Sequence, residues 1–358
     1  TDTNLKITDV AFTSGFSSVR RFNHAFKNNY RLNPSELRKS LSTKEKNQKV
    51  SQFDNGIILR LSYRPPLAWK TLISYLCSRG NSRVDKILIN EKGEEIYYKT
   101  ISLSAYLEKD KKEKAVTGWI SASLDEAKHQ IIVTMSPSLL PHLMLVQSKI
   151  RDLLDLDANP MVIEDHLCRD KALKKLITKN RGVRVAGTID GFDLALRAVL
   201  GQQISVKAAT TVYGRFVDAF GDDVETPIEG LDKTSPNPVQ IANTPIEKII
   251  SLGLTQRRAT TVKELAIATV NGSIPWDSGQ NEIILQQLLA LPGIGPWTGQ
   301  YVAMRGLKNP NAFPESDLGL MKALNVKKPR DVLERAKKWA PWRAYGAIYC
   351  WDSLSSGG

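Results

Sequence analysis

Leu288-Leu-Ala-Leu-Pro-Gly-Ile-Gly-Pro-Trp-Thr-Gly-Gln-Tyr-Val-Ala-Met304 is the most informative segment of this sequence for its fold. Apolar residues at helical spacing predict a helix that ends near Ala290 and is followed by a tight turn at residues 292–295. A second helix is expected to begin at Pro296, where the missing N–H costs nothing. Ile294 can pack between the two helices. The stretch therefore predicts a hairpin of two helices.

The turn and the start of the second helix predict a phosphate site built from backbone. Gly293 and Gly295 let the chain approach a partner closely, and Thr298 lies in the first helical turn. That turn presents unpaired N–H groups and the positive end of the helix dipole, which attract a phosphate without reading sequence. The pattern L-P-G-I-G-x-x-T is typical of a helix-hairpin-helix. A generic tight turn between two helices is the alternative.

An acidic residue follows at the start of the next apolar helix, in Phe313-Pro-Glu-Ser-Asp-Leu-Gly-Leu320. Taken alone, Asp317 is most simply an N-cap, because aspartate is common there for structural reasons. Soon after a phosphate-binding hairpin, it instead indicates a catalytic carboxylate. Glu315 is the nearby rival for that role, and Ser316 could support the acid as a hydrogen-bond donor.

Composition narrows the class of partner. The chain has 358 residues, a formal net charge of +13 and a pI near 9.5, which favour a polyanionic partner, first of all nucleic acid. Charge that serves solubility alone is the alternative. Cys77, Cys168 and Cys350 are too few for a four-cysteine iron–sulfur site and lie too far apart for a zinc cluster, so we expect buried thiols in a reducing cytoplasm. No stretch is long and apolar enough to span a membrane, and the first residues do not resemble a signal peptide.

Four parts follow one another along the chain. Strands are expected at 56–63, 84–89, 95–101, 119–123 and 130–135, whereas helical patterns dominate after residue 138, among them one continuous helix over 160–178. The length suits two or three domains. The expected parts are a small basic helical unit (1–42), a polar linker (43–51), an α+β domain with a mostly antiparallel sheet (52–140) and a helical domain (141–358).

The N-terminal unit carries a helix-turn-helix signal. Residues 7–12 have apolar side chains at helical spacing, a glycine turn follows, and residues 19–27 form a second amphipathic helix. Pro34 is expected to start a third helix by the N-terminal proline rule. The unit predicts a second place where DNA binds.

Several segments, in one order, resemble a known family. They are Phe192–Val206 (FDLALRAVLGQQISV), Leu252–Ala259 (LGLTQRRA), the hairpin, Pro314–Leu320 and Pro341–Tyr345 (PWRAY). Together they are similar to the 3-methyladenine DNA glycosylase II (AlkA) family of the HhH-GPD superfamily, over about residues 52–352. The resemblance implies a mostly helical glycosylase fold with a TBP-like antiparallel sheet in the domain before it.

The same resemblance implies an activity and its residues. The family excises alkylated purines that are flipped out of duplex DNA and leaves an abasic site. Asp317 would stabilise the positive charge on the sugar, Tyr301 and Trp351 would form walls of the base pocket, and Trp297 would lie near its mouth. A wedge that fills the gap in the duplex falls on Gln203, where the best-known relative carries an apolar residue. The aromatic side chains could equally be ordinary core residues.

Cofactors follow from the resemblance in the same way. Bifunctional relatives carry a lysine in the hairpin helix, but Trp297 occupies that place and no lysine lies between Leu288 and Gly306, so we expect no lyase chemistry. No cofactor is expected to be required, and neither zinc nor an iron–sulfur cluster. A sodium or potassium ion bound by the main-chain carbonyls of Leu289, Leu291 and Ile294 is expected at the hairpin.

The N-terminal unit resembles the second helix-turn-helix of AraC/XylS-type regulators. Its recognition helix would begin near Ser18 and enter the major groove, with contacts from Arg20, Arg21, Asn23 and Lys27. We expect a fragment of an Ada-like fusion that binds double-stranded DNA as a monomer in the nucleoid. A transcription regulator with a non-catalytic hairpin domain, and a hairpin scaffold protein, are the alternative functions.

Overall fold

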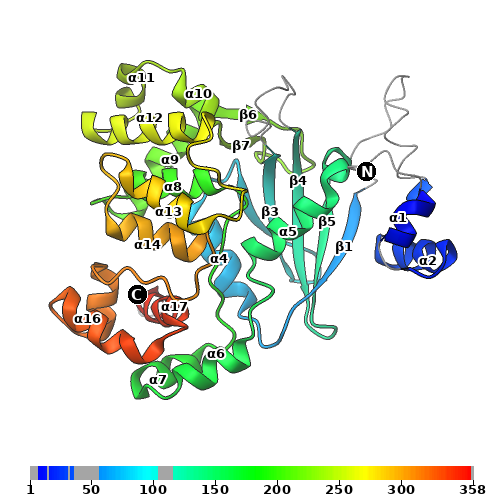
Figure 1. Cartoon of the computed structure of the whole chain (residues 1–358), viewed down its shortest axis with the longest axis horizontal. Helices are drawn as coiled ribbons and strands as arrows, with labels where there is room; N and C mark the ends of the chain where they lie inside the picture. The colour runs from blue at the N-terminus through cyan, green and yellow to red at the C-terminus, as the bar shows by residue number, and fades with distance from the viewer. Residues whose placement is uncertain (1–6, 14–15, 31–32, 36–55, 104–115, 356–358) are drawn as a thin grey trace.

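The computed structural model describes residues 7–13, 16–30, 33–35, 56–103 and 116–355. The expected linker at 43–51 lies outside these residues. An antiparallel sheet occupies one side of the molecule and a helical domain the other (Figure 1). Of the helices in the described ranges, none is long and apolar enough to cross a membrane.

The sheet has five strands in the order β1-β5-β4-β3-β2, and every neighbouring pair is antiparallel. Burial alternates along β1, where Leu59 and Leu61 point into the core and the residues between them are partly exposed. This alternation confirms the expected antiparallel α+β domain. The strands are β1 (Ile57–Ser62), β2 (Asp85–Ile89), β3 (Glu95–Leu103), β4 (Val116–Asp125) and β5 (Gln130–Met135).

Two helices share the core of the sheet. In α4 (Trp69–Arg79), Leu72 and Ile73 are buried, and α5 (Leu143–Leu153) adds Val146 and Ile150 to the same apolar cluster. Each such side chain stabilises the domain by about 1.5–3 kcal/mol. A short 3-10 helix, η2 (Pro137–His142), connects β5 to α5. The core of the sheet domain therefore continues past residue 140.

The helical domain is built around α8 (Gly191–Leu200), which is buried along most of its length. The expected helix over 160–178 is in fact two helices, because Asp170 accepts a hydrogen bond from Ala172 N (2.8 Å) and starts the second one. The other elements are α6 (Pro160–Leu167), α7 (Lys171–Lys179), α9 (Val206–Phe220), β6 (Gly221–Asp223), β7 (Lys233–Pro236), α10 (Pro238–Ala242), α11 (Ile246–Ser251), α12 (Gln256–Val270), α13 (Asn281–Ala290), α14 (Pro296–Arg305), α15 (Leu318–Leu324), α16 (Pro329–Ala336), η3 (Lys337–Trp339) and α17 (Arg343–Ser355).

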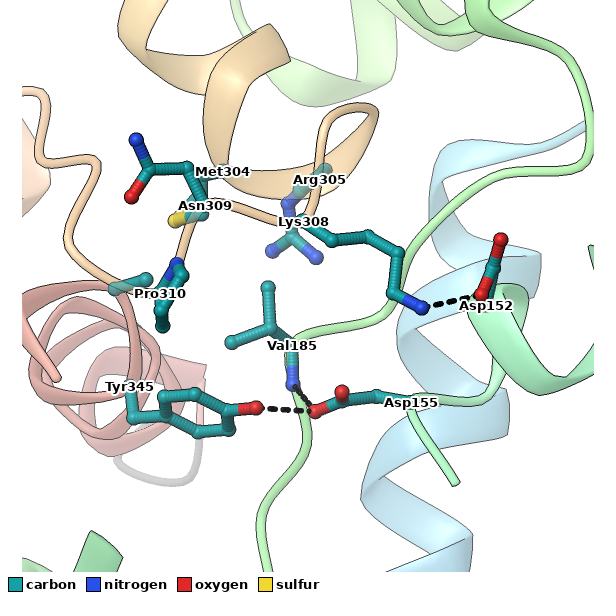
Figure 2. A pocket seen from close by; sticks show the side chains of 10 residues that line it. Asp152, Asp155, Val185, Met304, Arg305, Lys308, Asn309, Pro310 and Tyr345 are labelled. Carbon is teal, nitrogen blue, oxygen red and sulfur yellow. Dashed lines mark hydrogen bonds and ion pairs between the residues drawn. The ribbon is translucent and has the colours of Figure 1, made fainter. Parts of the chain in front are cut away.

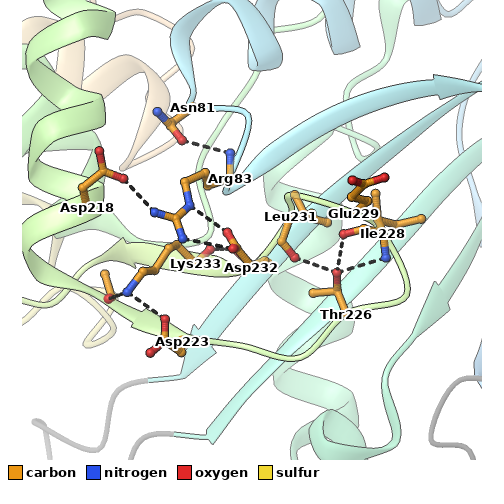
Figure 3. A network of polar contacts seen from close by, with 12 residues as sticks. Asn81, Arg83, Asp218, Asp223, Thr226, Ile228, Glu229, Leu231, Asp232 and Lys233 are labelled. Atoms are coloured by element: carbon orange, nitrogen blue, oxygen red, sulfur yellow. Dashed lines mark hydrogen bonds and ion pairs between the residues drawn. The ribbon is translucent and has the colours of Figure 1, made fainter.

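A polar network connects the two domains. Arg83, just before β2, donates to both carboxylate oxygens of Asp232 (2.8 and 3.0 Å) and to Asp218 of α9 (2.9 Å) (Figure 3). The hydrogen bond from Arg83 lowers the pKa of Asp232. Thr100 of β3 also donates to Lys233 O of β7 (2.7 Å). The bidentate geometry fixes one domain against the other.

Two N-terminal helices, α1 (Ile7–Thr13) and α2 (Val19–Tyr30), lie beside the edge strand β1 (Figure 1). Both helices were expected. Phe22 is buried and contacts the ring of Phe16 edge-on, while Phe26 packs against the core of the sheet. Pro34 is helical, as expected, and the rest of the predicted third helix lies outside the described residues.

Candidate active site

The hairpin has the expected elements, α13 and α14 joined by a tight turn. Ile294 is buried between them in the core, and Thr261 of α12 donates to Pro292 O (2.8 Å). Gly293 has a φ of +86°, and a Cβ there would clash with the Thr261 hydroxyl. Glycine at 293 is therefore required both by its left-handed backbone and by packing.

Gly295 differs from Gly293. It caps α14 with an ordinary φ of −100°, and a Cβ built on it would meet no atom within 4 Å. The fold does not need glycine at this position, so the missing side chain leaves open space beside the first turn of the helix. The N–H groups of that turn have no partner within the helix.

Thr298 is placed differently from what we expected of a phosphate contact. Its side chain is buried, and its Oγ1 accepts a hydrogen bond from Gln202 Nε2 (3.2 Å). Gln202 also donates to Gly293 O (3.0 Å), which connects the loop after α8 to the hairpin. The part of Thr298 that remains for a phosphate is its backbone N–H, one of the N–H groups of the first turn of α14.

The expected cation site lies on the same turn. Leu289 is exposed at the end of α13, and Leu291 O already accepts from Ile294 N (3.2 Å). The ion stays a prediction. In the part of the chain that the structure describes, no three His, Cys, Asp or Glu side chains gather to hold a metal ion, and the three cysteines are free thiols.

Asp317 is the N-cap of α15 and also the acceptor of two indole groups. Its Oδ1 accepts from Leu320 N (2.9 Å) and from Trp351 Nε1 (2.8 Å), and its Oδ2 accepts from Trp297 Nε1 (3.0 Å). The carboxylate is half-buried. Three donors from three helices therefore fix its orientation, which an ordinary cap would not need.

Gly319 makes this approach of Trp351 possible. A Cβ on Gly319 would lie 2.9 Å from Asp317 Oδ1 and 3.2 Å from Trp351 Cδ1. A side chain there would force the indole away from the carboxylate. The glycine two residues after the acid is thus part of the site.

The expected pocket residues lie together around Asp317. The rings of Trp297 and Tyr301 are stacked, with centroids 5.2 Å apart and planes 10° from parallel, so each ring covers a face of the other. Trp351 reaches the other carboxylate oxygen from α17. All three side chains are half-buried, and none is fully enclosed in the core.

Two further residues complete this cluster, and sequence reasoning missed both. Tyr75 of α4 shares a hydrogen bond between its hydroxyl and that of Tyr301 (2.7 Å). Arg305 is buried, donates to Ala186 O (2.8 Å), and holds its guanidinium 4.0 Å from the centre of the Tyr75 ring. The sequence did offer a sign of Arg305, because it is a charged residue in the apolar run of α14. It offered none of Tyr75, which comes from the other domain.

Gln203, the expected wedge, lies in the exposed loop between α8 and α9. Its φ is +58°, an uncommon value for a residue other than glycine. Its neighbours Ile204 and Val206 are also exposed, and Ser205 caps α9 by accepting from Ala208 N (3.2 Å). The loop therefore presents both polar and apolar side chains.

A cavity of about 60 Å³, lined in part by Arg305, lies apart from Asp317 (Figure 2). Its lining includes Asp155, Lys308 and Tyr345, but not Asp317. It has room for about two waters, not for a purine. Burial raises the pKa of Asp155 to about 6, although Tyr345 and Val185 N donate to it (2.9 and 3.1 Å).

The expected DNA contacts of the N-terminal unit have different surroundings. Arg20, Arg21 and Lys27 are exposed on α2. Ser18 accepts from Arg21 N (3.3 Å), so its hydroxyl is used as a helix cap. Asn23 is half-buried and its Oδ1 is enclosed, so that oxygen does not face solvent.

Comparison with known proteins places this geometry in a family. Family models match the AlkA N-terminal domain over residues 58–190 and the HhH-GPD superfamily base excision DNA repair protein over residues 196–339. A Mycobacterium tuberculosis protein, named as a probable bifunctional transcriptional activator/DNA repair enzyme AlkA, is 33% identical over 357 residues, which cover 98% of this chain and 68% of that protein. The chain belongs to the AlkA family.

Other glycosylases are similar over most of the chain. The Escherichia coli DNA-3-methyladenine glycosylase 2 is 27% identical over 292 residues, which cover 81% of this chain and 95% of that protein. The structure of a 3-methyladenine DNA-glycosylase from Archaeoglobus fulgidus matches with a TM-score of 0.66 over 82% of this chain and 96% of that one, at 22% identity. That likeness confirms the fold, a mostly helical glycosylase domain with an antiparallel sheet before it.

Proposed function

We propose that this chain is a monofunctional DNA glycosylase that removes alkylated purines from double-stranded DNA. The observation that carries the proposal is the Asp317 carboxylate, held by Trp297, Trp351 and the N-terminus of α15 just after a hairpin suited to phosphate. A protein that only binds DNA needs the hairpin, but it has no use for a carboxylate fixed among aromatic rings.

The reaction explains why a carboxylate is needed. As the N-glycosidic bond breaks, the base leaves with the electron pair and positive charge grows on the sugar. Asp317 stabilises that charge electrostatically, and a water adds to C1′ and loses a proton. Oδ2 accepts only the Trp297 indole among the hydrogen bonds of the described residues, so it retains a lone pair for the sugar or the water.

The aromatic rings suit the departing base. Alkylated purines are cationic, and they are attracted to the faces of electron-rich rings. Trp351 and Trp297 supply such faces beside Asp317, and Tyr301 is stacked against Trp297. The base must be flipped to reach them, and the loop at Gln203 fills the gap it leaves in the duplex.

The absence of lyase chemistry follows from the residue in the hairpin helix. Trp297 occupies the place where bifunctional relatives carry lysine, and its Nε1 is engaged with Asp317 (3.0 Å). Without an amine, no Schiff base forms with the sugar. Water is then the nucleophile and an abasic site is the product.

The N-terminal helices add a second contact with DNA in this proposal. The Mycobacterium tuberculosis relative, whose name includes a transcriptional activator, aligns with 98% of this chain. Arg20, Arg21 and Lys27 lie exposed on one helix, as an AraC-type recognition helix requires. A regulator without catalysis is the second candidate function, and it is favoured by these helices alone.

The test is a panel of duplex oligonucleotides that carry single lesions, with the released bases identified by mass. We expect free 3-methyladenine or 7-methylguanine and an intact abasic strand that breaks only after alkali. A protein that binds the duplexes but releases no base would support the regulator instead. Strand cleavage without alkali would contradict the monofunctional assignment.

A further inference from the structure

We propose that Tyr75 is a positioning residue that presents the Tyr301 hydroxyl to the flipped base as a hydrogen-bond donor. This inference rests on the proposed function, because it concerns the same pocket. It adds a polar, selective contact to a site that is otherwise aromatic.

The hydroxyl groups of Tyr75 and Tyr301 have two protons, and the hydrogen bond between them takes only one. Tyr75 and Tyr301 are joined by a single hydrogen bond of 2.7 Å, in which one hydroxyl donates and the other accepts. Two hydroxyls carry two protons, so one O–H remains for another acceptor. Neither hydroxyl has a second hydrogen bond to any described residue. A partly buried O–H without an acceptor in the protein is available to a ligand that supplies one.

The surroundings of Tyr301 leave its hydroxyl edge to meet a ligand. Trp297 stacks on one face of the ring, at 5.2 Å between centroids, and the Arg305 guanidinium lies 5.4 Å from the ring centre. The edge of the ring is therefore the part that can turn toward a purine held beside Asp317. Nitrogen and carbonyl acceptors lie on the edge of every purine.

Charge around the pair makes Tyr301 the stronger donor. Burial would raise the pKa of Tyr301, but the Arg305 cation and the hydrogen bond with Tyr75 outweigh it and lower the pKa. Burial raises the pKa of Tyr75. Either hydroxyl can donate within the pair; when Tyr75 donates to Tyr301, the proton of Tyr301 is left for the ligand. Tyr75 lies in α4, so the sheet domain contributes directly to the pocket.

The consequence is selectivity between neutral and cationic bases. A cationic alkylpurine leaves readily and gains little from another donor. A neutral purine leaves as an anion unless a donor stabilises it, so the hydroxyl should matter most for neutral bases. Removal of one hydroxyl therefore discriminates between the two kinds of lesion, which a merely structural defect would not.

The experiment compares Tyr75→Phe and Tyr301→Phe with wild type in single-turnover release of hypoxanthine, a neutral purine, and 7-methylguanine, a cationic one. Each variant keeps its ring and should melt within a few degrees of wild type. We expect hypoxanthine release to fall about tenfold, as the loss of one hydrogen bond implies, and 7-methylguanine release to fall by a clearly smaller factor in the same variants. The double variant should be no slower than Tyr301→Phe. Tyr98→Phe, on β3, is the matched control and should release both bases at the wild-type rate.

Equal losses for both bases, or no loss for either, would overturn the inference. So would a wild type that releases 7-methylguanine but no hypoxanthine, and that result would leave the proposed function standing. A wild type that releases neither base would defeat the proposed function and this inference with it.

Discussion

At the scale of single residues, Asp317 has a structural and a chemical use that do not exclude each other. It caps α15 through Leu320 N, which any good capping residue would do, and it also accepts two indole N–H groups. The sequence predicted both the helix cap and the catalytic carboxylate. It could not predict that the indoles of Trp297 and Trp351 would donate to the same side chain. Trp351 lies in the last helix, and its approach depends on packing around Gly319.

A second buried acid gives a prediction about pH. The pKa of Asp155 is raised from 3.8 to about 6 in the folded state. The folded state therefore holds a proton that the unfolded state has released, and this stabilisation is lost as pH rises toward 6. Both donors, Tyr345 and Val185 N, contact Oδ2, so an asparagine amide oxygen can accept both. Asp155→Asn should be more stable than wild type above pH 6 by up to about 3 kcal/mol.

Thermal melting at several pH values checks this. The difference in Tm between Asp155→Asn and wild type should grow from about pH 4 to about pH 6 and then stay constant. Asp157→Asn is the control of opposite sign, because the hydrogen bond from Arg151 lowers the pKa of Asp157. Loss of the Asp157 charge should therefore destabilise the protein above pH 4. An Asp155→Asn variant less stable than wild type at pH 7 would contradict the prediction.

At the scale of elements, the hairpin was predictable because its signals are local. The Pro-Gly turn, the proline start and the apolar spacing all lie within one stretch of sequence, and the helices end where those signals place them. Elsewhere local signals were weaker. The apolar spacing runs on through Asp170 and gave no sign of the helix break there. The short β6–β7 pair packs against α9 and β3, which are distant in sequence from one another.

The two glycines of the hairpin yield different predictions. Gly295→Ala adds a Cβ that meets no protein atom, so the melting temperature should not change. Affinity for duplex DNA should fall for all sequences alike, because the Cβ enters the space of a phosphate. Gly293→Ala should instead destabilise the protein by roughly 1–3 kcal/mol, since it combines a left-handed φ with a clash at Thr261.

Melting curves and duplex binding measured on both variants separate these effects. Ala290→Gly, at the end of α13, serves as a control for small changes in the hairpin. If Gly295→Ala bound every duplex as tightly as wild type, the backbone phosphate site would be excluded.

At the scale of the whole molecule, the pocket combines parts far apart in the chain. Tyr75 comes from the sheet domain, Tyr301 and Arg305 from α14, and Trp351 from α17. Sequence reasoning found the residues that lie inside recognisable motifs. It could not find Tyr75, whose role exists only because the Arg83 network and the sheet hold α4 against the helical domain.

The N-terminal helices give a prediction about salt. If Arg20 and Arg21 contact phosphates, the Arg20→Ala/Arg21→Ala variant should bind long undamaged duplexes with a salt slope smaller by about two. Excision from a short duplex should be unchanged, because α2 lies on the opposite side of the sheet from α13 and α14 (Figure 1). Binding titrations at several salt concentrations measure the slope.

Lys70→Ala/Lys128→Ala is the matched control, since it removes two exposed cations of the sheet domain. An unchanged slope in the arginine variant, or an equal fall in the control, would remove the N-terminal helices from DNA binding.

The central claim is that the Asp317 carboxylate stabilises the sugar as the base departs. The most direct measurement is single-turnover release of 7-methylguanine by wild type, Asp317→Asn and Glu315→Gln. Asparagine keeps the helix cap and the Trp351 contact, but its amide nitrogen faces the Trp297 N–H, so melting and DNA binding of Asp317→Asn are measured beside its excision. Excision should fall at least on the order of a hundredfold. Glu315→Gln should excise at the wild-type rate. Equal rates for wild type and Asp317→Asn would contradict the account.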